Sequence, residues 1–392
     1  MFKTNKTSLA LACMSTLLLS ACHQAKVNQS LSGVEVSAEK WGEADKQTVH
    51  LYTLKNSQGM TVKLSDWGGY IQSIIVADRK GEFADVLVGY DSWDEYYNDC
   101  CYAGPIVGRF GNRIGKAQFS IDGQTYQLSA NDGGANKDIN QLHGGFKGLH
   151  KRLWQSELIE NGVQLSYLSK DGEEGYPGNL QIKLNITLSD DNELQFEYFA
   201  TTDKKTHVNL TSHTYFNLSG DMQTDIEQHV LQINANKITP VDQYLIPTGE
   251  LEPVVGTPFD FTSAKKIGRD IRQPNKQLRY GGGVDKQHGG YDHNWVFTDY
   301  DGSLKNQVSL HDPVSGRLLE IYTQEPAIQF YSGNFMDGTM LGKNGQPVKF
   351  RYGLALEPQH YPDSPNQASF PSTLLVPGDT YHTISSYKFS VK

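Results

Sequence analysis

Ionisable and hydrogen-bonding side chains gather in five short segments of the chain. Imidazoles and carboxylates exchange protons near neutral pH, and arginine donates hydrogen bonds in a planar fork, so this mixture suits proton transfer on a hydroxyl-rich ligand. Glycine or proline flanks each segment, which favours strand ends and loops that could line one pocket. The five segments are 108–115, 142–146, 209–220, 291–295 and 354–366.

The first two segments combine basic side chains with glycine. Asn112 and Arg113 follow Arg109, and a guanidinium can bond two neighbouring hydroxyl oxygens of a polyol at once. A salt-bridged surface strand explains the same pattern. His143 precedes two glycines that let backbone approach closely, although a structural or merely exposed histidine is the alternative. These glycines lack the spacing of a phosphate-binding loop.

The third and fourth segments place polar groups in apolar surroundings, which costs stability unless the groups are paired or functional. His213 and Tyr215 are expected on one face of a strand, because residues two apart share a face. Asp292 lies close to Trp295, whose indole suits the C–H side of a sugar. A turn held by the Asp292 side chain is the alternative.

Glu357 ends an apolar run in the fifth segment, so burial could tune its carboxyl for proton transfer. A structural glutamate paired with an arginine is equally consistent with the residues alone. Glu357 and Asp292 could also form the carboxylate pair of a glycosidase, a mechanism that depends on their separation. The chain contains no H-E-x-x-H, G-x-S-x-G or dinucleotide-binding glycine motif.

The elements that must position these segments have the period of β-strands. Turn signals such as Asp122-Gly123 and Asn161-Gly162 separate the alternating runs, and 38 glycines can supply positive-φ positions. Helical periodicity is limited to one short turn at 92–98. We therefore predict an all-β chain in which residues 41–392 form one large antiparallel β-sandwich. The alternating runs are 49–54, 61–64, 117–121, 181–188 and 193–198.

Residues 1–21 have the pattern of an export signal: a basic start, a mostly apolar stretch too short to span a bilayer, and small residues at the end. The sequence that ends at Cys22 resembles a lipoprotein signal. We expect cleavage before Cys22, lipidation of its thiol, and a flexible tether over residues 22–40. The protein would then lie on the periplasmic side of the cell envelope, with His23 favouring the outer membrane. A plain secretory signal is the alternative.

The charge balance argues against nucleic acid as a partner. The net charge is −9, and removal of Lys3 and Lys6 with the signal makes it −11. An acidic surface repels nucleic acid and gains nothing from anionic lipid, so membrane association would depend on the lipid anchor alone. No protein partner is predicted.

Cys100 and Cys101 are the cysteines that remain once the signal is removed and Cys22 is lipidated. Neighbouring cysteines rarely form a disulfide without strain, so we expect two small, partly buried thiols. A redox role in an exported protein is the alternative. No C-x-x-C pair supports a zinc or thioredoxin-like site.

Together and in this order, the segments resemble the aldose 1-epimerase (galactose mutarotase) family over essentially all of residues 41–392. The resemblance implies a large twisted β-sandwich and an isomerase that interconverts the α and β anomers of free aldoses such as glucose and galactose. The expected partner is therefore a small free monosaccharide. The matching motifs lie at 112–113, 142–145, 212–218, 292–294, 329–335 and 356–359.

The same resemblance implies residue roles. Glu357 would take the proton of the anomeric hydroxyl while His213 protonates the ring oxygen, and rotation about the C1–C2 bond would precede closure. No cofactor or metal is expected. A non-catalytic sugar-binding surface lipoprotein, or a hydrolase or lyase on a related sandwich, is the alternative. The residues implied to hold the sugar are Asn112, Arg113, His143, Tyr215, Asp292 and Gln329.

Overall fold

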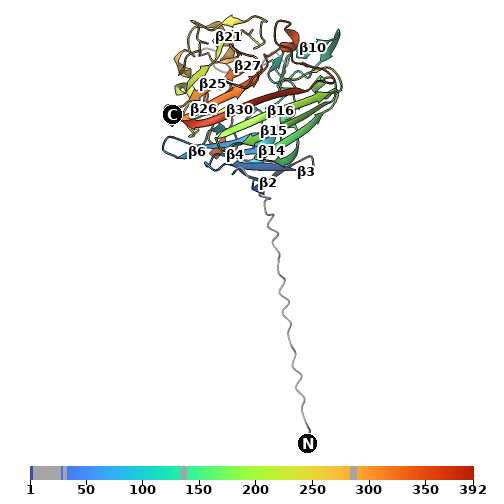
Figure 1. The fold of residues 1–392 in the computed structure, drawn as a ribbon, viewed down its shortest axis with the longest axis vertical. Coiled ribbons are helices and arrows are strands. Elements are labelled where there is room, and N and C mark those ends of the chain that lie inside the picture. The colour runs from blue at the N-terminus through green and yellow to red at the C-terminus, as the bar shows by residue number, and fades with distance from the viewer. Residues whose placement is uncertain (3–27, 30–32, 134–138, 283–288) are drawn as a thin grey trace.

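The computed structural model describes residues 1–2, 28–29, 33–133, 139–282 and 289–392. Cys22 and almost all of the expected export signal lie outside these residues. The described chain consists mainly of antiparallel strands, which confirms the all-β prediction (Figure 1). Within it, no helix is long and apolar enough to span a bilayer.

The largest sheet has nine strands, in the order β13-β14-β15-β16-β30-β26-β25-β20-β23, and Figure 1 shows its central strands side by side. Alternation sets its register: Ile186 lies opposite Phe196, and both are buried. The strands are Gln155–Ile159 (β13), Gly162–Ser169 (β14), Leu180–Leu188 (β15), Glu193–Thr202 (β16), Tyr381–Val391 (β30), Arg317–Thr323 (β26), Lys305–His311 (β25), Val230–Ile233 (β20) and Lys265–Lys266 (β23).

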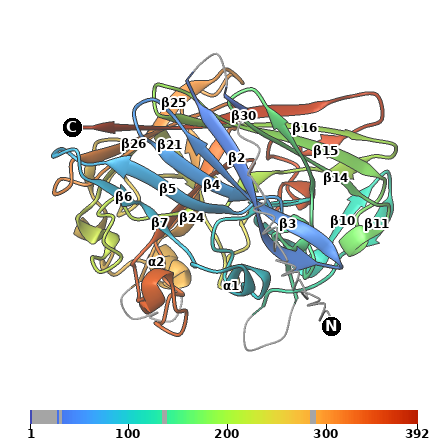
Figure 2. The same ribbon diagram turned by 90° about the horizontal axis from the view of Figure 1, so that it is seen from below.

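A six-stranded sheet, β1 to β6 in chain order, holds the N-terminal part of the fold (Figure 2). Val34 and Val36 are buried in the core, and strand β2 begins at Glu35. The predicted tether over residues 22–40 is therefore wrong at its end, because two alternating valines are too short a run to identify a strand. The strands are Asn28–Gln29 (β1), Glu35–Ala44 (β2), Gln47–Lys55 (β3), Thr61–Ser65 (β4), Ile71–Ala77 (β5) and Phe83–Asp85 (β6).

A third sheet of seven strands, in the order β22-β21-β24-β27-β28-β19-β7, carries the polar segments. Its three central strands are buried along their whole length. Alternation places Trp295, Phe330 and Leu356 on one face of these strands and Asn294, Gln329 and Glu357 on the other. The strands are Glu252–Pro253 (β22), Ala235–Thr239 (β21), Asp292–Phe297 (β24), Ala327–Tyr331 (β27), Leu354–Gln359 (β28), Tyr215–Phe216 (β19) and Leu87–Val88 (β7).

Short elements complete the described fold. Helix α1 (Trp93–Tyr97) confirms the helical turn expected at 92–98, whereas α2 (Lys276–Gly281) was not predicted. Asp122 and Gly123 have positive φ values and close the β10–β11 hairpin, as their sequence indicates. The paired short strands are Gln118–Ile121 (β10) with Gln124–Gln127 (β11), Arg113–Ile114 (β9) with Gln141–Leu142 (β12), Ile106–Val107 (β8) with Thr211–Ser212 (β18), and Thr206–His207 (β17) with Leu374–Leu375 (β29).

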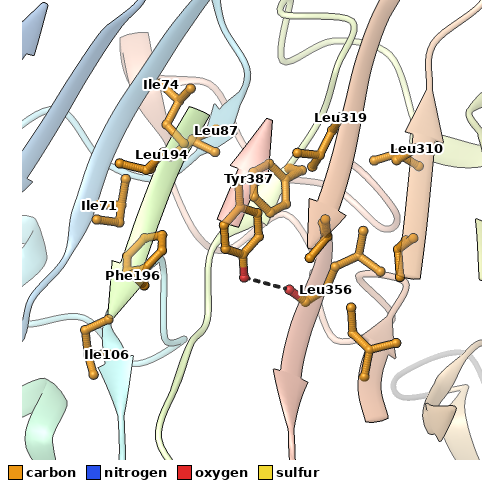
Figure 3. Packing of buried hydrophobic residues seen from close by; sticks show 14 of the residues in the cluster. Ile71, Ile74, Leu87, Ile106, Leu194, Phe196, Leu310, Leu319, Leu356 and Tyr387 are labelled. Carbon is orange, nitrogen blue, oxygen red and sulfur yellow. Dashed lines mark hydrogen bonds between the residues drawn. The ribbon is translucent and has the colours of Figure 1, made fainter. Parts of the chain in front are cut away.

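The core lies where the three large sheets meet. Figure 3 shows Leu194 and Phe196 of β16 packed near Ile71 of β5, with Tyr387 of β30 beside them. The Tyr387 hydroxyl donates to the Leu356 carbonyl oxygen at 3.4 Å, which joins the nine-stranded sheet to the seven-stranded sheet. The backbone on one side of Glu357 is therefore anchored in the apolar core.

Replacement of both Val34 and Val36 with alanine tests whether this segment belongs to the fold. Each of the two substitutions should lower the free energy of unfolding by about 2 kcal/mol, because it shortens a buried apolar side chain. Urea unfolding measures the change. The exposed Glu35 and Glu39 of the same strand provide the control, and their alanine variants should unfold like the parent protein. Equal stability of the valine and glutamate variants would show that the segment is a tether after all.

Candidate active site

A cavity of about 430 Å³ opens beside strands β19, β24, β27 and β28. This volume is in the range of small-molecule sites. Seven of the eight residues that the sequence predicts to act on or hold the ligand line it, and they come from loops as well as strands. They are Asn112, Arg113, His143, His213, Tyr215, Asp292 and Glu357.

Gln329, the eighth predicted residue, is not among those that line the cavity. Strand pairing places it opposite both Glu357 and Asn294, in the middle of the sheet. Its side chain is buried, and its amide nitrogen donates to Asp292 Oδ1 at 2.7 Å. Gln329 therefore positions Asp292, which does face the cavity.

The strand expected to carry His213 and Tyr215 is interrupted. Strand β18 ends at Ser212 and β19 begins at Tyr215, while the His213 backbone N–H donates to the Pro105 carbonyl oxygen at 2.9 Å. Both rings still reach the cavity, with centroids 5.0 Å apart. The break turns His213 toward β28 instead of leaving it in register within the sheet.

Glu357 and His213 face each other. Glu357 Oε1 is 3.7 Å from His213 Nε2, and both side chains are almost completely buried. Burial raises the pKa of Glu357 well above its usual value, the nearby Asp292 raises it further, and Arg113 lowers it. Burial also lowers the pKa of His213 to about 4. Burial thus disfavours the charged form of both groups, so a proton on Glu357 is favoured over a proton on His213.

Glu357 Oε2 is buried without a hydrogen-bond partner among the described residues. A buried carboxyl oxygen without a hydrogen-bond partner is costly, so this atom is placed for a ligand that supplies one. A hydroxyl group in the cavity would satisfy it.

His143 presents a defined tautomer to the cavity. The Asn112 backbone N–H donates to His143 Nδ1 at 3.1 Å, so the proton of the neutral ring is on Nε2. Burial lowers the pKa of His143 well below its usual value, and His213 and Arg113 lower it further. The next residue, Gly144, lets the loop lie against the backbone of Gly108, because a Cβ there would lie 1.9 Å from the Gly108 carbonyl oxygen.

Arg113 lies beside two acids of the cavity. Its Nε is 3.0 Å from Asp132 Oδ2, and its Nη1 is 3.9 Å from Asp292 Oδ2. Burial alone lowers the pKa of Arg113, but Asp132 and Asp292 outweigh that effect and raise it. The guanidinium thus remains charged, with donors available to sugar hydroxyls.

Two residues from the predicted segments lie elsewhere. Arg109 is buried and donates to the carbonyl oxygens of Pro177 and Ser169, so it supports loops and is neither a ligand for the sugar nor part of a surface strand. Trp295 is buried in the core beside Phe259, because on β24 it faces away from Asp292. The indole therefore cannot support a sugar.

Other residues line the cavity that sequence reasoning did not select. Tyr102 packs its ring against His143 and His213, with centroid distances of 4.7 and 5.8 Å. Phe335 and Tyr331 stack at 5.9 Å and provide aromatic surface, and Phe335 is half-exposed. The motif at 329–335 contains both, so their position in it was the available signal.

The adjacent cysteines also differ from expectation. Cys100 and Cys101 form a disulfide and are not free thiols, and both line the cavity. Nothing in the spacing of two neighbouring cysteines reveals this pairing.

One set of cavity residues has the donor types of a metal site. A nitrogen of His143, a nitrogen of His213 and an oxygen of Glu357 lie within 4.8 Å of one another. A divalent cation placed there would occupy the same atoms that proton transfer requires.

Comparisons with known proteins agree with this geometry. The family model described as aldose 1-epimerase matches residues 50–388. The chain is 41% identical to galactose mutarotase of Homo sapiens over 88% of this chain and 95% of the relative, and 38% identical to aldose 1-epimerase of Escherichia coli K12 over 88% and 96%. A solved aldose epimerase homologue from C. elegans superimposes with a TM-score of 0.76 at 31% identity, over 86% of this chain and 97% of that one.

Replacement of Glu357 with glutamine should stabilise the protein. Because the folded-state pKa of Glu357 is raised, its ionised form opposes folding above that pKa, and the penalty disappears as the pH falls toward the unfolded value near 4.5. We expect a gain of about 1–3 kcal/mol at pH 8 that shrinks with acidity. Urea unfolding across pH measures it.

Asp132→Asn is the matched control. This variant should be less stable than the parent protein, because Arg113 loses its ion-pair partner. A Glu357→Gln variant that is less stable than the parent at pH 8 would contradict the assigned pKa shift.

Proposed function

Because the chain belongs to the aldose 1-epimerase family, we propose that Glu357 and His213 are the base and the acid of its reaction. The protein is an isomerase that interconverts the α and β anomers of free aldoses such as glucose and galactose. The observation that carries the residue assignment is the buried Oε2 of Glu357, which has no hydrogen-bond partner in the described part of the chain, next to an Oε1 that is 3.7 Å from His213 Nε2.

The reaction starts from a carboxylate and an imidazolium. Transfer of the shared proton from Glu357 to His213 produces this state. The Glu357 carboxylate then takes the proton of the anomeric hydroxyl while the bond between C1 and the ring oxygen breaks, and His213 gives its proton to that oxygen. The product is the open-chain aldehyde, bound to a protonated Glu357 and a neutral His213.

Burial favours the protonation state that follows ring opening. Desolvation raises the pKa of Glu357 and lowers that of His213, so the neutral pair is preferred when the sugar is open. Rotation about the C1–C2 bond presents the other face of the aldehyde, and the two proton transfers run in reverse on closure. Both anomers can enter the same cycle, as an epimerase requires.

The remaining cavity residues hold the sugar. The Arg113 guanidinium donates to hydroxyl oxygens, the Asp292 carboxylate accepts from hydroxyls, and Asn112 and Tyr215 line the same wall. His143 donates from Nε2, which suits an oxygen next to the one that His213 protonates. Gln329 contributes through its hydrogen bond to Asp292.

Polarimetry of freshly dissolved α-galactose and α-glucose tests the assignment. Glu357→Gln and His213→Asn should each lower kcat by about 10²- to 10⁴-fold, the usual contribution of a general acid or base. The rate of the parent enzyme should also fall on the alkaline side, as the pair loses its shared proton above the raised pKa of Glu357.

Glu325→Gln is the matched control. Glu325 is a buried glutamate that pairs with His360 Nδ1 at 2.7 Å, outside the lining of the sugar cavity. Its removal should leave kcat unchanged. Normal turnover by Glu357→Gln would refute the proton-transfer roles, whereas a parent protein without activity on any aldose would favour a sugar-binding protein.

We also propose that the protein is exported and carries a lipid on Cys22. The support is the sequence alone: a basic start, an apolar stretch and small residues before the cysteine, followed by His23. An acidic chain gains no attraction from anionic lipid, so the acyl chains would hold it on the periplasmic side of the envelope, at the outer membrane.

Cell fractionation of the full chain and of Cys22→Ser tests this location. The parent should appear in the membrane fraction and incorporate labelled palmitate, and the variant should do neither. Cys13→Ser, which changes a cysteine inside the signal, is the control and should behave like the parent. Recovery of the parent protein in the soluble fraction without label would disprove the anchor.

A further inference from the structure

The Cys100–Cys101 disulfide does not hold the fold together. A disulfide stabilises chiefly by restricting the unfolded chain, and a bond between neighbours closes almost no loop. Its position is more informative, since both residues line the sugar cavity. Cys100 is exposed and Cys101 is partly exposed, so a solute can reach the bond.

Asp99 fixes the base of this loop. Its buried carboxylate accepts hydrogen bonds from the Tyr70 and Tyr90 hydroxyls at 2.9 and 3.0 Å, and from the backbone N–H groups of Cys101 and Ala103, both at 2.8 Å. These four hydrogen bonds to one carboxylate fix the backbone of the loop around Asp99. The loop is therefore anchored at Asp99, while Cys100 and Cys101 line the cavity.

Two contacts connect the disulfide to the residues that bind and transform the sugar. The Cys101 carbonyl oxygen accepts from the Tyr215 hydroxyl at 3.3 Å. The next residue, Tyr102, packs its ring against His143 and His213. A shift of the 100–102 backbone would displace Tyr215 and the packing of both histidines.

We propose that Cys100 and Cys101 form a thiol–disulfide site in the wall of the sugar cavity, opened by a dithiol reductant, and that the disulfide form binds sugar more tightly. The proposal rests on the cavity being the sugar site. One thiolate of the reductant attacks a cysteine sulfur, the S–S bond breaks and a mixed disulfide forms. The second thiol of the reductant then displaces it, so two electrons and two protons reach the cysteines and the reductant leaves as a cyclic disulfide.

The disulfide form should bind sugar more tightly because its cavity wall is pre-organised. Breaking the bond moves the two sulfurs apart to van der Waals distance and removes the covalent restraint on both side chains, while Asp99 still holds the Cys101 N–H. The wall then has to be ordered again whenever a sugar binds.

The test compares mutarotation kinetics of the full chain with and without dithiothreitol. Reduction should raise KM for α-galactose by about threefold to tenfold, the cost of ordering a wall residue on binding. The value of kcat should change less. The double variant Cys100→Ser/Cys101→Ser should start with the raised KM and should not respond to dithiothreitol, whereas Glu325→Gln should respond like the parent.

A second measurement does not depend on turnover. Iodoacetamide should alkylate Cys100 and Cys101 only after reduction, and galactose should slow that alkylation, as followed by mass spectrometry of the peptide. Equal KM in both redox states, or alkylation at a rate that galactose leaves unchanged, would overturn the proposal. A protein that turns over no aldose in either state contradicts the proposed function instead, and the protection by galactose then decides the present proposal.

Discussion

The burial of two ionisable side chains, Glu357 and His213, is the constraint on which the rest of the site depends. Removing a carboxylate and an imidazole from water is unfavourable, and each shifts its pKa toward the neutral form. That cost is tolerated because the opposite face of the same sheet belongs to a large apolar core. The stability of the fold thus supports a locally unfavourable arrangement, as active sites often require.

Strand register places further polar residues next to the buried Glu357. Glu357, Gln329 and Asn294 lie opposite one another on three neighbouring strands, so these strands present a polar row on one face of the sheet. Arg113 reaches this face from another part of the chain and offsets part of the negative charge of Asp132 and Asp292. Arg113 also lowers the pKa of Glu357, which burial and Asp292 raise.

Loops form the wall of the cavity that contains Tyr102 and His143, and the register of the sheet does not set their conformation. His143 is oriented by the backbone of Asn112, and Tyr102 packs between the histidines and the disulfide. Asp99 anchors this wall through four hydrogen bonds. The cavity therefore combines a rigid floor of strands with a wall whose covalent state can change.

The sequence by itself determined the fold class and most of the site. Period-two runs such as 181–188 are local, so they identify strands before any contact is known. The ordered motifs pointed to Glu357, His213 and six ligand-holding residues, five of which line the cavity. It misplaced the start of the fold, because Val34 and Val36 show their role only when they pack against distant strands.

Only the tertiary structure decided which faces and atoms meet. It turned Trp295 and Arg109 away from the cavity and placed Gln329 behind Asp292. It also joined Cys100 to Cys101 and brought Glu357 within 3.7 Å of His213. These are distances between residues far apart in the chain, or dihedral choices within a loop. A one-dimensional pattern contains neither, since both are set by the packing of the whole molecule.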